Sequence, residues 1–404
     1  MKKKILFVIN TLGRAGAERA LLELMGAVDR QKYQVFLYIL AGQGELIGEV
    51  PAGVKVLNRT VDETPVLSKE GLRHLMTRLF WRSLRKGALF YRLPYLLKNA
   101  VLLAKQHQFS LNKLTRRLLC DAADPLPQTF DLAVAYLEGG ASFYVRDCVK
   151  AKKKAAFIHV DYQQAGYNRT LDDDCYLSFD RIFTVSKDVK TSFLQVYPMC
   201  ADRTQVFLNV INRKRIEKKA KEASGFSDGY KGFRILTIGR LYAQKAFEVS
   251  IEAMRLLKEQ GIKARWYVLG EGEERANLER QIAQAKLNKD FILLGAVENP
   301  YPYLAQTDLY VHASRFEGKS IAVQEAQVLG CPIIVSNCSG NREQVTDGVD
   351  GLFCELTAES ICEQIIKLYQ DEKLRKQLGQ SAKERPLGTE GELQKLYDIL
   401  EEGV

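Results

Sequence analysis

The stretch from Glu317 to Glu325, Glu-Gly-Lys-Ser-Ile-Ala-Val-Gln-Glu, constrains this chain more than any other part of it. An apolar run from Leu309 to Ser314 precedes it and predicts a buried strand. A helical pattern follows it and ends at Gly330, a residue typical of a helix C-terminus. In an α/β domain, ligands bind where a strand passes through a short loop into a helix N-terminus. The stretch therefore predicts a binding site.

The residues of this stretch suit a polar ligand. Glu317 falls in the loop, and Gly318 lets the backbone approach a ligand closely. Glu325 lies further along the helix, where its carboxylate could chelate a vicinal diol. The first-turn amides that could donate to hydroxyl or phosphate oxygens belong to Lys319, Ser320 and Ile321. An amphipathic helix with two solvated glutamates would explain the same residues, and the stretch alone leaves both interpretations open.

A second strand–loop–helix junction follows Phe233. The strand expected over 233–238 ends at Gly239, and a helix is expected over about 247–259. Arg240 and Lys245 flank the single turn between them, where two cations could clamp a diphosphate. The alternative is that both are ordinary surface charges.

Together these motifs resemble the donor site of retaining family 4 glycosyltransferases, within glycosyl transferases group 1, of the type that builds bacterial cell-surface polysaccharides. The resemblance implies the GT-B fold, in which two Rossmann-like, doubly wound α/β domains face each other across a cleft. It implies that Arg240 and Lys245 bind the donor diphosphate and take part in catalysis. It also implies that Glu317, another catalytic residue, lies beside the donor sugar and that Glu325 holds the ribose. Lys319 and Ser320 stand where many members carry an aromatic residue and Pro, which leaves the donor sugar open.

The N-terminal half resembles the family more loosely, through a glycine loop after the first strand, the segment around His159 and the exit at Asn209. The resemblance implies that His159 is a catalytic residue lining the cleft, although a histidine at a strand end is often purely structural. It further implies a set of glycines and one loop residue at the donor, namely Gly13, Gly16, Gly239, Gly270 and Val297.

The length of 404 residues favours two domains. We expect an N-terminal acceptor domain over 1–212 and a C-terminal donor domain over 213–390. The resemblance implies that the last helix, within 391–404, crosses back to the N-terminal domain.

Composition narrows the compartment and the chemistry. The sequence has no uninterrupted apolar run of about 18 residues, so we expect no transmembrane helix. The apolar run after Lys2–Lys4 is too short for a signal peptide and is better explained by a first strand. The eight cysteines include no Cys-x-x-Cys pair, and the four histidines show no metal-binding spacing. We therefore expect reduced thiols, a cytoplasmic location, and neither a metal nor a cofactor.

The net charge of +10 is concentrated in one segment, 69–117, which contains twelve basic residues and one acidic residue. Apolar residues recur there at helical spacing with aromatic residues between them, a pattern that suits the interface of an anionic membrane. The alternative is a helical pair packed on the N-terminal domain with solvated arginines, and both interpretations can hold together. The cations expected to face the membrane or the acceptor are Arg73, Arg78, Arg82, Arg85 and Lys86.

These observations predict a metal-independent, retaining glycosyltransferase of the hexosyltransferase type. It would move a sugar from a nucleotide-sugar, most simply a UDP-sugar, to a lipid-linked glycan at the inner face of the cytoplasmic membrane, for example in a capsule pathway. The alternative to a lipid-linked acceptor is a soluble one. An epimerase or hydrolase of the same fold and a non-catalytic, membrane-bound scaffold are rival functions. Nucleic-acid binding is the weakest interpretation, and we expect no nucleic-acid partner.

Overall fold

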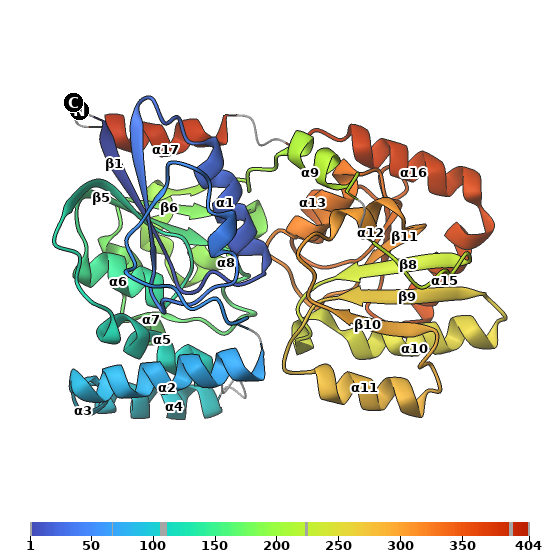
Figure 1. Ribbon diagram of the computed structural model, residues 1–404, viewed down its shortest axis with the longest axis horizontal. Coiled ribbons are helices and arrows are strands. Elements are labelled where there is room, and N and C mark those ends of the chain that lie inside the picture. Colours follow the sequence, from blue (N-terminus) through green and yellow to red (C-terminus); the bar gives the residue numbers. More distant parts are fainter. Residues whose placement is uncertain (1, 67, 106–110, 223–224, 388–390, 403–404) are drawn as a thin grey trace. The chain divides into compact units, whose positions relative to one another are not determined.

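The computed structural model describes residues 2–66, 68–105, 111–222, 225–387 and 391–402. The chain divides into two compact units, one formed by Met1–Val210 with Thr389–Val404 and the other by Ile211–Gly388. Each unit is a parallel sheet with helices on both faces, so the predicted α/β class is confirmed (Figure 1). Because such sheets are covered on both faces, most of their strands are rich in buried apolar residues.

The N-terminal unit holds a seven-stranded sheet in the order β3-β2-β1-β4-β5-β6-β7. Its strands are β1 Lys3–Ile9, β2 Tyr33–Ile39, β3 Lys55–Val56, β4 Thr129–Ala135, β5 Lys150–Ile158, β6 Arg181–Thr184 and β7 Thr204–Val206. Its helices are α1 Gly16–Ala27, α2 Lys69–Arg85, α3 Ala88–Tyr91, α4 Leu93–Lys105, α5 Leu111–Ala122, α6 Gly140–Cys148, α7 Arg169–Asp172, α8 Lys187–Val196 and α17 Glu392–Glu401. Short 3-10 turns lie at Ile47–Glu49, Cys175–Ser178 and Pro198–Arg203. The strand order reverses between β1 and β4, so loops that follow these two strands meet at the carboxyl edge of the sheet.

Helix α17 packs on the N-terminal unit although it follows the C-terminal one in sequence. The ring of Tyr397 stacks on that of Tyr33 with centroids 4.6 Å apart. The Lys3 ammonium donates to the carbonyl of Leu400 over 2.6 Å, which ties the first strand to the last helix.

The C-terminal unit holds a six-stranded sheet in the order β10-β9-β8-β11-β12-β13. Its strands are β8 Phe233–Ile238, β9 Ala264–Leu269, β10 Phe291–Gly295, β11 Leu309–His312, β12 Ile333–Ser336 and β13 Leu352–Cys354. Its helices are α9 Arg213–Lys219, α10 Phe247–Glu259, α11 Arg275–Gln284, α12 Tyr301–Ala305, α13 Ile321–Val328, α14 Asn341–Gln344, α15 Ala358–Gln370 and α16 Glu372–Glu384, with a 3-10 turn at Ala243–Lys245. Here the order reverses between β8 and β11, so the two junctions singled out in the sequence meet.

Two apolar clusters cover the two faces of the C-terminal sheet. Ile235 and Val311 belong to one cluster, while their neighbours Leu236 and Tyr310 belong to the other. This alternation is the two-residue period of a strand. It fixes which side chains of β8 and β11 enter the core on one face of the sheet and which enter the core on the other.

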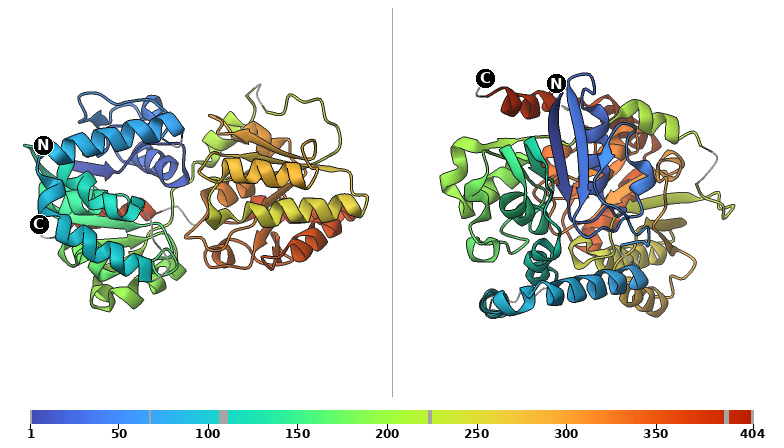
Figure 2. Two further views of the ribbon diagram at one scale, coloured as in Figure 1. Left: turned by 90° about the horizontal axis from the view of Figure 1, so that it is seen from below. Right: turned by 60° about the vertical axis from the view of Figure 1, so that its left-hand side comes forward.

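Helices α2, α3 and α4 form a helical layer at one edge of the N-terminal unit, resting on α5 (Figure 1; Figure 2). A small core of Leu79, Ala88, Leu118 and Ala122 joins α2 and α3 to α5. Among the helices described, none combines the length and apolar character needed to cross a bilayer.

Candidate functional site

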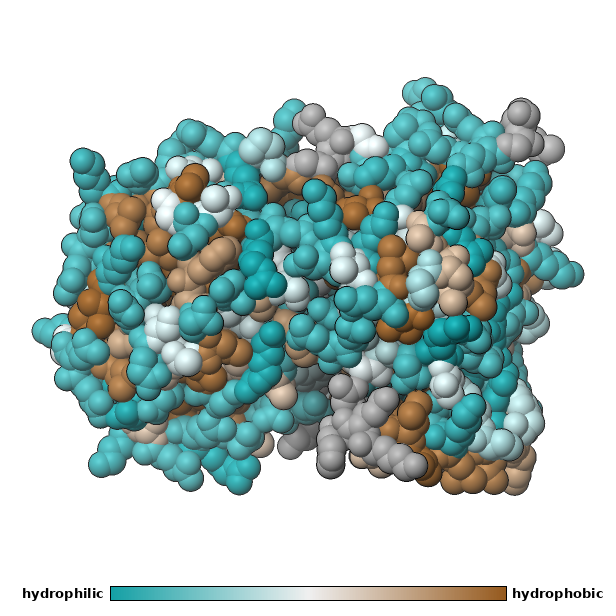
Figure 3. Space-filling model, turned by 180° about the vertical axis from the view of Figure 1, so that it is seen from behind, coloured by the Kyte–Doolittle hydropathy of each residue, from teal (hydrophilic) through white to brown (hydrophobic). Residues whose placement is uncertain are grey.

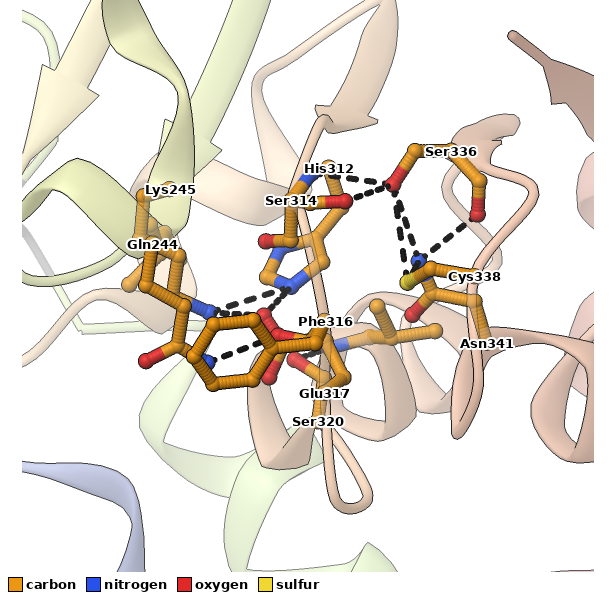
Figure 4. Close-up of polar contacts among 12 residues, drawn as sticks. Gln244, Lys245, His312, Ser314, Phe316, Glu317, Ser320, Ser336, Cys338 and Asn341 are labelled. Atoms are coloured by element: carbon orange, nitrogen blue, oxygen red, sulfur yellow. Dashed lines mark hydrogen bonds and ion pairs between the residues drawn. The ribbon is translucent and has the colours of Figure 1, made fainter. Parts of the chain in front are cut away.

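The loop between β11 and α13 brings three polar side chains together (Figure 4). The Lys245 ammonium lies 2.5 Å from Oε1 of Glu317. The ring nitrogen Nε2 of His312 lies 3.1 Å from the same oxygen and 3.2 Å from Lys245 Nζ. Glu317 follows β11, His312 ends it, and Lys245 comes from the turn after β8. The reversal of strand order is therefore what joins residues 67 or more positions apart.

Burial and charge set the state of this cluster. Glu317 is 6% exposed and His312 is 1% exposed. Burial alone would raise the pKa of Glu317, but the Lys245 ammonium and the His312 hydrogen bond outweigh it and hold that pKa well below its ordinary value. Burial, reinforced by the positive charge of Lys245, lowers the pKa of His312. At neutral pH the cluster thus contains an ammonium, a carboxylate and a neutral imidazole.

The start of α13 is tied to α14 by a side-chain amide. The Ser320 hydroxyl caps the helix by accepting from the Val323 amide over 3.4 Å. Gln344 accepts from the Ser320 amide and donates to the Ser320 carbonyl, both over 2.7 Å. The expectation that the Ser320 amide is free for a ligand is therefore wrong, because Gln344 already uses it.

The second glutamate of the motif is buried as well. Glu325 is 4% exposed, and the hydroxyl of Tyr301 on α12 donates to its Oε1 over 2.9 Å. Helix α13 is buried along nearly its whole length, since seven of its eight residues are buried. The alternative of an amphipathic helix with two solvated glutamates is therefore excluded, because two buried carboxylates with specific donors are a built arrangement.

The two predicted phosphate-binding cations differ in their surroundings. Lys245 is paired with Glu317, and its side chain is 14% exposed. Arg240 is exposed, with its guanidinium 5.0 Å from the ring centroid of Tyr242, and it forms no ion pair with any residue that the structure describes. A ligand reaching this crevice would meet Arg240 as a solvated charge and Lys245 as one already engaged.

Glycines allow the loops of the crevice to touch. A Cβ atom at Gly270 would lie 1.9 Å from the carbonyl oxygen of Gly239, so the turns after β8 and β9 meet through backbone alone. Gly340 has φ +79°, and a Cβ there would lie 2.5 Å from the carbonyl oxygen of Gly318. Val297, in the loop after β10, is partly buried against the apolar cluster below the crevice.

The N-terminal unit has its own polar junction at the corresponding reversal of strand order. Glu138 follows β4 and is 4% exposed. Its Oε1 accepts the backbone amides of His159 and, over 3.2 Å, of Val160 at the end of β5. Burial lowers the pKa of His159 to about 4, and its buried Nε2 has no hydrogen-bond partner among the described residues. Glu138 thus fixes the backbone of the predicted His159, whose side-chain nitrogen is left without a protein partner.

The predicted glycine loop is held by a side chain that sequence reasoning did not single out. The Glu45 carboxylate accepts the amide of Arg14 over 3.1 Å and that of Val66 over 3.0 Å. A Cβ at Gly13 would lie 3.1 Å from the Cβ of Val66, a tight fit, and Gly16 opens α1. The loop is therefore packed against its neighbours by contacts from distant sequence.

Two of the five predicted membrane-facing cations are used within the protein. Arg78 donates to Gln43 over 2.8 Å and pairs with Asp62 at 3.2 Å. Lys86 donates to the carbonyl of Ala123 over 2.6 Å and pairs with Asp124 at 3.0 Å. Arg78 and Lys86 thus have partners within the protein, although Lys86 is exposed, as are Arg73, Arg82 and Arg85. A membrane contact of these five cations stays a prediction.

The helical layer also exposes large apolar side chains. Hydrophobic residues gather over this part of the N-terminal unit, at the lower right of the space-filling view (Figure 3). They are Leu72, Phe80, Trp81, Phe90, Tyr91, Leu93, Leu97 and Val101. Contiguous exposed apolar side chains of this kind mark interaction sites.

Some residues of the site carried little or no sequence signal. His312 could have been noticed as the one ionisable residue at the end of an apolar strand. Gln344 carried no signal, because a glutamine in a short helix gives no hint of which loop it braces. Tyr301 and Glu138 likewise act through contacts that only the fold creates.

The C-terminal unit is similar to a known family of proteins. Residues 218–385 match the family described as Glycosyl transferases group 1. A Campylobacter jejuni protein, N-acetylgalactosamine-N,N'-diacetylbacillosaminyl-diphospho-undecaprenol 4-alpha-N-acetylgalactosaminyltransferase, is 30% identical over 220 residues, which are 54% of this chain and 58% of that one. The Staphylococcus aureus capsular polysaccharide biosynthesis glycosyltransferase CapM is 26% identical over 155 residues, 38% of this chain and 41% of that one. The chain thus spans between about two fifths and three fifths of the length of these two relatives.

Solved structures share the fold of this chain. The crystal structure of Anabaena Alr3699/HepE in complex with UDP and glucose matches 99% of this chain and 100% of its own, with a TM-score of 0.68 and 17% identity. The pneumococcal O-GlcNAc transferase GtfA in complex with UDP and GlcNAc matches 73% of this chain and 60% of its own, with a TM-score of 0.54 and 20% identity. These likenesses establish the predicted GT-B fold.

Proposed function

We propose that this chain, whose C-terminal unit matches glycosyl transferases group 1, is a glycosyltransferase of bacterial cell-surface polysaccharide synthesis. The observation that carries the proposal is the buried cluster of Lys245, Glu317 and His312. It lies where the strand order reverses, inside the segment that matches the family. A charged cluster built into the crevice at this point is suited to hold a polar ligand.

The proposed donor is a nucleotide-sugar, and UDP is the proposed nucleotide. Support for UDP comes from the structural relatives, several of which are described as complexes with UDP. Glu325, held by Tyr301, is assigned to the two ribose hydroxyls, because a carboxylate can accept from a vicinal diol. Arg240 and Lys245 are assigned to the diphosphate, and no metal is required in this scheme because two cations neutralise its charge.

The proposed reaction retains the configuration of the donor sugar. The acceptor hydroxyl attacks the anomeric carbon from the face that the diphosphate leaves, and the bond from that carbon to the diphosphate breaks. The hydroxyl proton passes to an oxygen of the leaving phosphate. Lys245 stabilises the charge on the leaving group, and Glu317 orients the sugar through its hydroxyls. An NMR assay of the anomeric configuration of the first product tests this step, since an inverted product contradicts it.

The proposed acceptor is a lipid-linked glycan, reached by docking of the helical layer on an anionic membrane. In support, the Campylobacter jejuni relative is named for an acceptor linked to diphospho-undecaprenol. Helix α2 carries both exposed apolar side chains, Phe80 and Trp81 among them, and the exposed cations Arg73, Arg82 and Arg85. Apolar area and positive charge on one surface are the two contributions that bind proteins to anionic membranes.

Calorimetric titration tests donor binding. UDP, GDP and CMP are titrated into the protein without added metal, and the best ligand is then titrated into Glu325→Ala and Arg240→Ala. We expect UDP to bind and both substitutions to weaken it by about tenfold or more. Arg255→Ala, on the outer surface of α10, is the matched arginine control. Absence of binding by all three nucleotides contradicts the proposal and favours the scaffold.

Consumption of donor separates transfer from the rival reactions. Candidate UDP-sugars are incubated with and without a lipid-linked glycan acceptor, and free UDP and glycosylated lipid are measured. Transfer predicts rapid UDP release only when acceptor is present. Equally rapid consumption or isomerisation of the donor without acceptor would instead identify a hydrolase or an epimerase.

Flotation with vesicles tests docking. Vesicles of anionic and of neutral lipid are compared for the wild type, for Trp81→Ser with Phe90→Ser, and for Arg73, Arg82 and Arg85 changed to Gln. We expect the wild type to float with anionic vesicles and both variants to float less. Arg280→Gln, an exposed arginine of the other unit, is the charge control. Equal flotation of all proteins removes the docking surface from the proposal.

A further inference from the structure

The carboxylate of Glu317 uses its two oxygens unequally. Lys245 Nζ and His312 Nε2 both approach Oε1, at 2.5 and 3.1 Å. Of the residues that the structure describes, none donates a hydrogen bond to Oε2. One oxygen of this carboxylate is therefore fully engaged by the protein, and the other is left for a ligand.

The proton positions of His312 follow from its two neighbours. Nε2 lies 3.1 Å from Glu317 Oε1, which can only accept, and 3.2 Å from the Lys245 ammonium, which can only donate. Because that ammonium already donates to Glu317 over 2.5 Å, we assign the ring proton to Nε2, which then donates it to Glu317. The other nitrogen, Nδ1, is then an acceptor and lies 3.1 Å from the hydroxyl of Tyr310 on the same strand. That hydroxyl is farther from its second neighbour, the carbonyl of Ile238, at 3.5 Å. Tyr310 therefore donates to His312, and His312 donates to Glu317.

We propose that His312 is a positioning residue, fixed by Tyr310, that holds Glu317 so that Oε2 faces the hydroxyls of the donor sugar. The inference rests on the proposed function for its ligand, but not for its geometry. A glutamate side chain has three rotatable bonds, and a single ion pair to the flexible Lys245 leaves its rotation poorly constrained. A second donor on the rigid strand β11 removes that freedom.

A buried leucine or phenylalanine at 312 would satisfy packing, so the imidazole is not required by the core. His312 is 1% exposed and lies among apolar neighbours on β11. Its neutral state also matters, because an imidazolium 3.2 Å from the Lys245 ammonium would push that cation away from Glu317. The neutral ring therefore leaves the ion pair of Lys245 with Glu317 intact.

NMR of the free protein tests the geometry without any ligand. The chain has only four histidines, so ¹⁵N-histidine labelling resolves them individually. We expect the His312 signals to report a neutral Nε2–H tautomer that does not titrate between pH 5.5 and 8, and we expect Tyr310→Phe to shift its Nδ1 resonance. An Nδ1–H tautomer, or titration like an ordinary histidine, overturns the inference whatever the protein does.

Binding and kinetics test the role. His312→Gln keeps an N–H donor near the position of Nε2, whereas His312→Leu keeps the volume without a donor. We expect His312→Leu to lower kcat/KM for the UDP-sugar donor by about tenfold or more, with UDP affinity unchanged within about twofold, and His312→Gln to restore at least half of the lost activity. His74→Leu, on α2, is the matched histidine control for donor binding.

The outcomes separate the inference from the proposed function. If the wild type binds no nucleotide, the proposed function fails while the NMR result still decides the geometry. If the wild type transfers sugar and His312→Leu does so equally well, the positioning role is wrong. If His312→Leu loses UDP and UDP-sugar affinity alike, the residue supports the whole crevice and the assignment to the sugar is wrong.

Discussion

Each unit has a buried glutamate at the point where the strand order of its sheet reverses, and the pKa values of the two glutamates are shifted in opposite directions. Glu138 follows β4 and Glu317 follows β11, each next to the strand at which the order reverses. Glu138 receives backbone amides of β5, whereas Glu317 receives an ammonium and an imidazole. Burial therefore raises the pKa of Glu138, while Lys245 holds the pKa of Glu317 below its ordinary value despite the burial.

The difference indicates that Glu138 has a structural role and that Glu317 is available to bind a ligand. Amide donors fix Glu138 to one strand end, so its oxygens serve the backbone that carries His159. Side-chain donors hold Glu317 by one oxygen and keep it charged in the crevice. Asp172 resembles Glu138, because burial raises the pKa of both carboxyl groups. Asp172 accepts a hydrogen bond from the hydroxyl of Tyr162 and forms no ion pair with any described residue.

The largest expected effect comes from removing the cation at Glu317. Lys245→Met leaves that carboxylate buried beside His312 alone, and we expect the C-terminal unit to lose about 4 kcal/mol of unfolding free energy. The buried Trp266 reports the unfolding of this unit by fluorescence in urea once the exposed Trp81 is replaced by Phe.

Two companion variants control this result. Lys245→Met combined with Glu317→Gln is expected to recover more than half of the loss, because no unpaired charge remains. Arg240→Met, at an exposed cation, is expected to change stability by less than about 0.5 kcal/mol. A similar loss for both single variants would mean that Glu317 does not depend on its ion pair.

Matched amide substitutions compare the two glutamates directly. Glu317→Gln leaves Lys245 without its counter-ion, and we expect a loss of about 2 kcal/mol at pH 7. Glu138→Gln keeps an oxygen for the amides of His159 and Val160 and removes a buried charge, so we expect no loss or a gain. Urea unfolding followed by circular dichroism measures both, and equal losses would remove the contrast between the sites.

The pH dependence of stability tests the raised pKa of a buried carboxyl group in the N-terminal unit, that of Asp172. Burial raises the pKa of Asp172 from 3.8 to about 7. Between pH 4 and 7 the folded state keeps a proton that the unfolded state has released, so the contribution of Asp172 to stability falls as the pH rises through this window. Because His159 acts in the opposite direction, the measured quantity is the difference in unfolding free energy between the wild type and Asp172→Asn, and we expect it to fall by about 2 kcal/mol between pH 5 and 7 in urea unfolding. An unchanged slope in the variant would contradict the raised pKa.

The smallest expected effect is at Glu325, because the group that donates a hydrogen bond to this carboxylate, the Tyr301 hydroxyl, is neutral. Tyr301→Phe removes the hydroxyl that donates to this carboxylate over 2.9 Å. A neutral hydrogen bond contributes about 1 kcal/mol, so we expect UDP affinity to fall by about threefold to fivefold in calorimetry. A loss as large as that of Glu325→Ala would show that Tyr301 contacts the nucleotide itself.

Much of the C-terminal unit could be predicted from sequence because its signals are local. The apolar runs that end at Gly239 and before Glu317 predict where the strands stop and the loops begin, from only a few neighbouring residues. The spacing of Arg240 and Lys245 likewise lies within one turn. The pairing of Lys245 with Glu317 is different in kind, because it depends on β8 and β11 being neighbours in the sheet.

The basic segment shows where local signals mislead. Its helices follow from apolar spacing, but the pattern cannot tell a solvated arginine from a paired one. Arg78 and Lys86 pair with acidic residues outside the segment, whereas Arg73, Arg82 and Arg85 are exposed and none of their charges could be told apart from the pattern. His159 shows the same limit, because its surroundings depend on Glu138 in another loop.

The amino-acid sequence by itself determined the elements, their α/β order and the residue types at the two junctions, because periodicity, glycines and charges act over a few residues. Only the tertiary structure decided which oxygen of Glu317 is engaged, that His312 and Tyr310 form a relay behind it, and that Glu138 is a brace. The contacts of Glu317 with Lys245 and of Glu138 with the end of β5 join strand ends that are separated in the chain. Their energies depend on burial and on the charge of the neighbour, and both exist only once the sheets have formed.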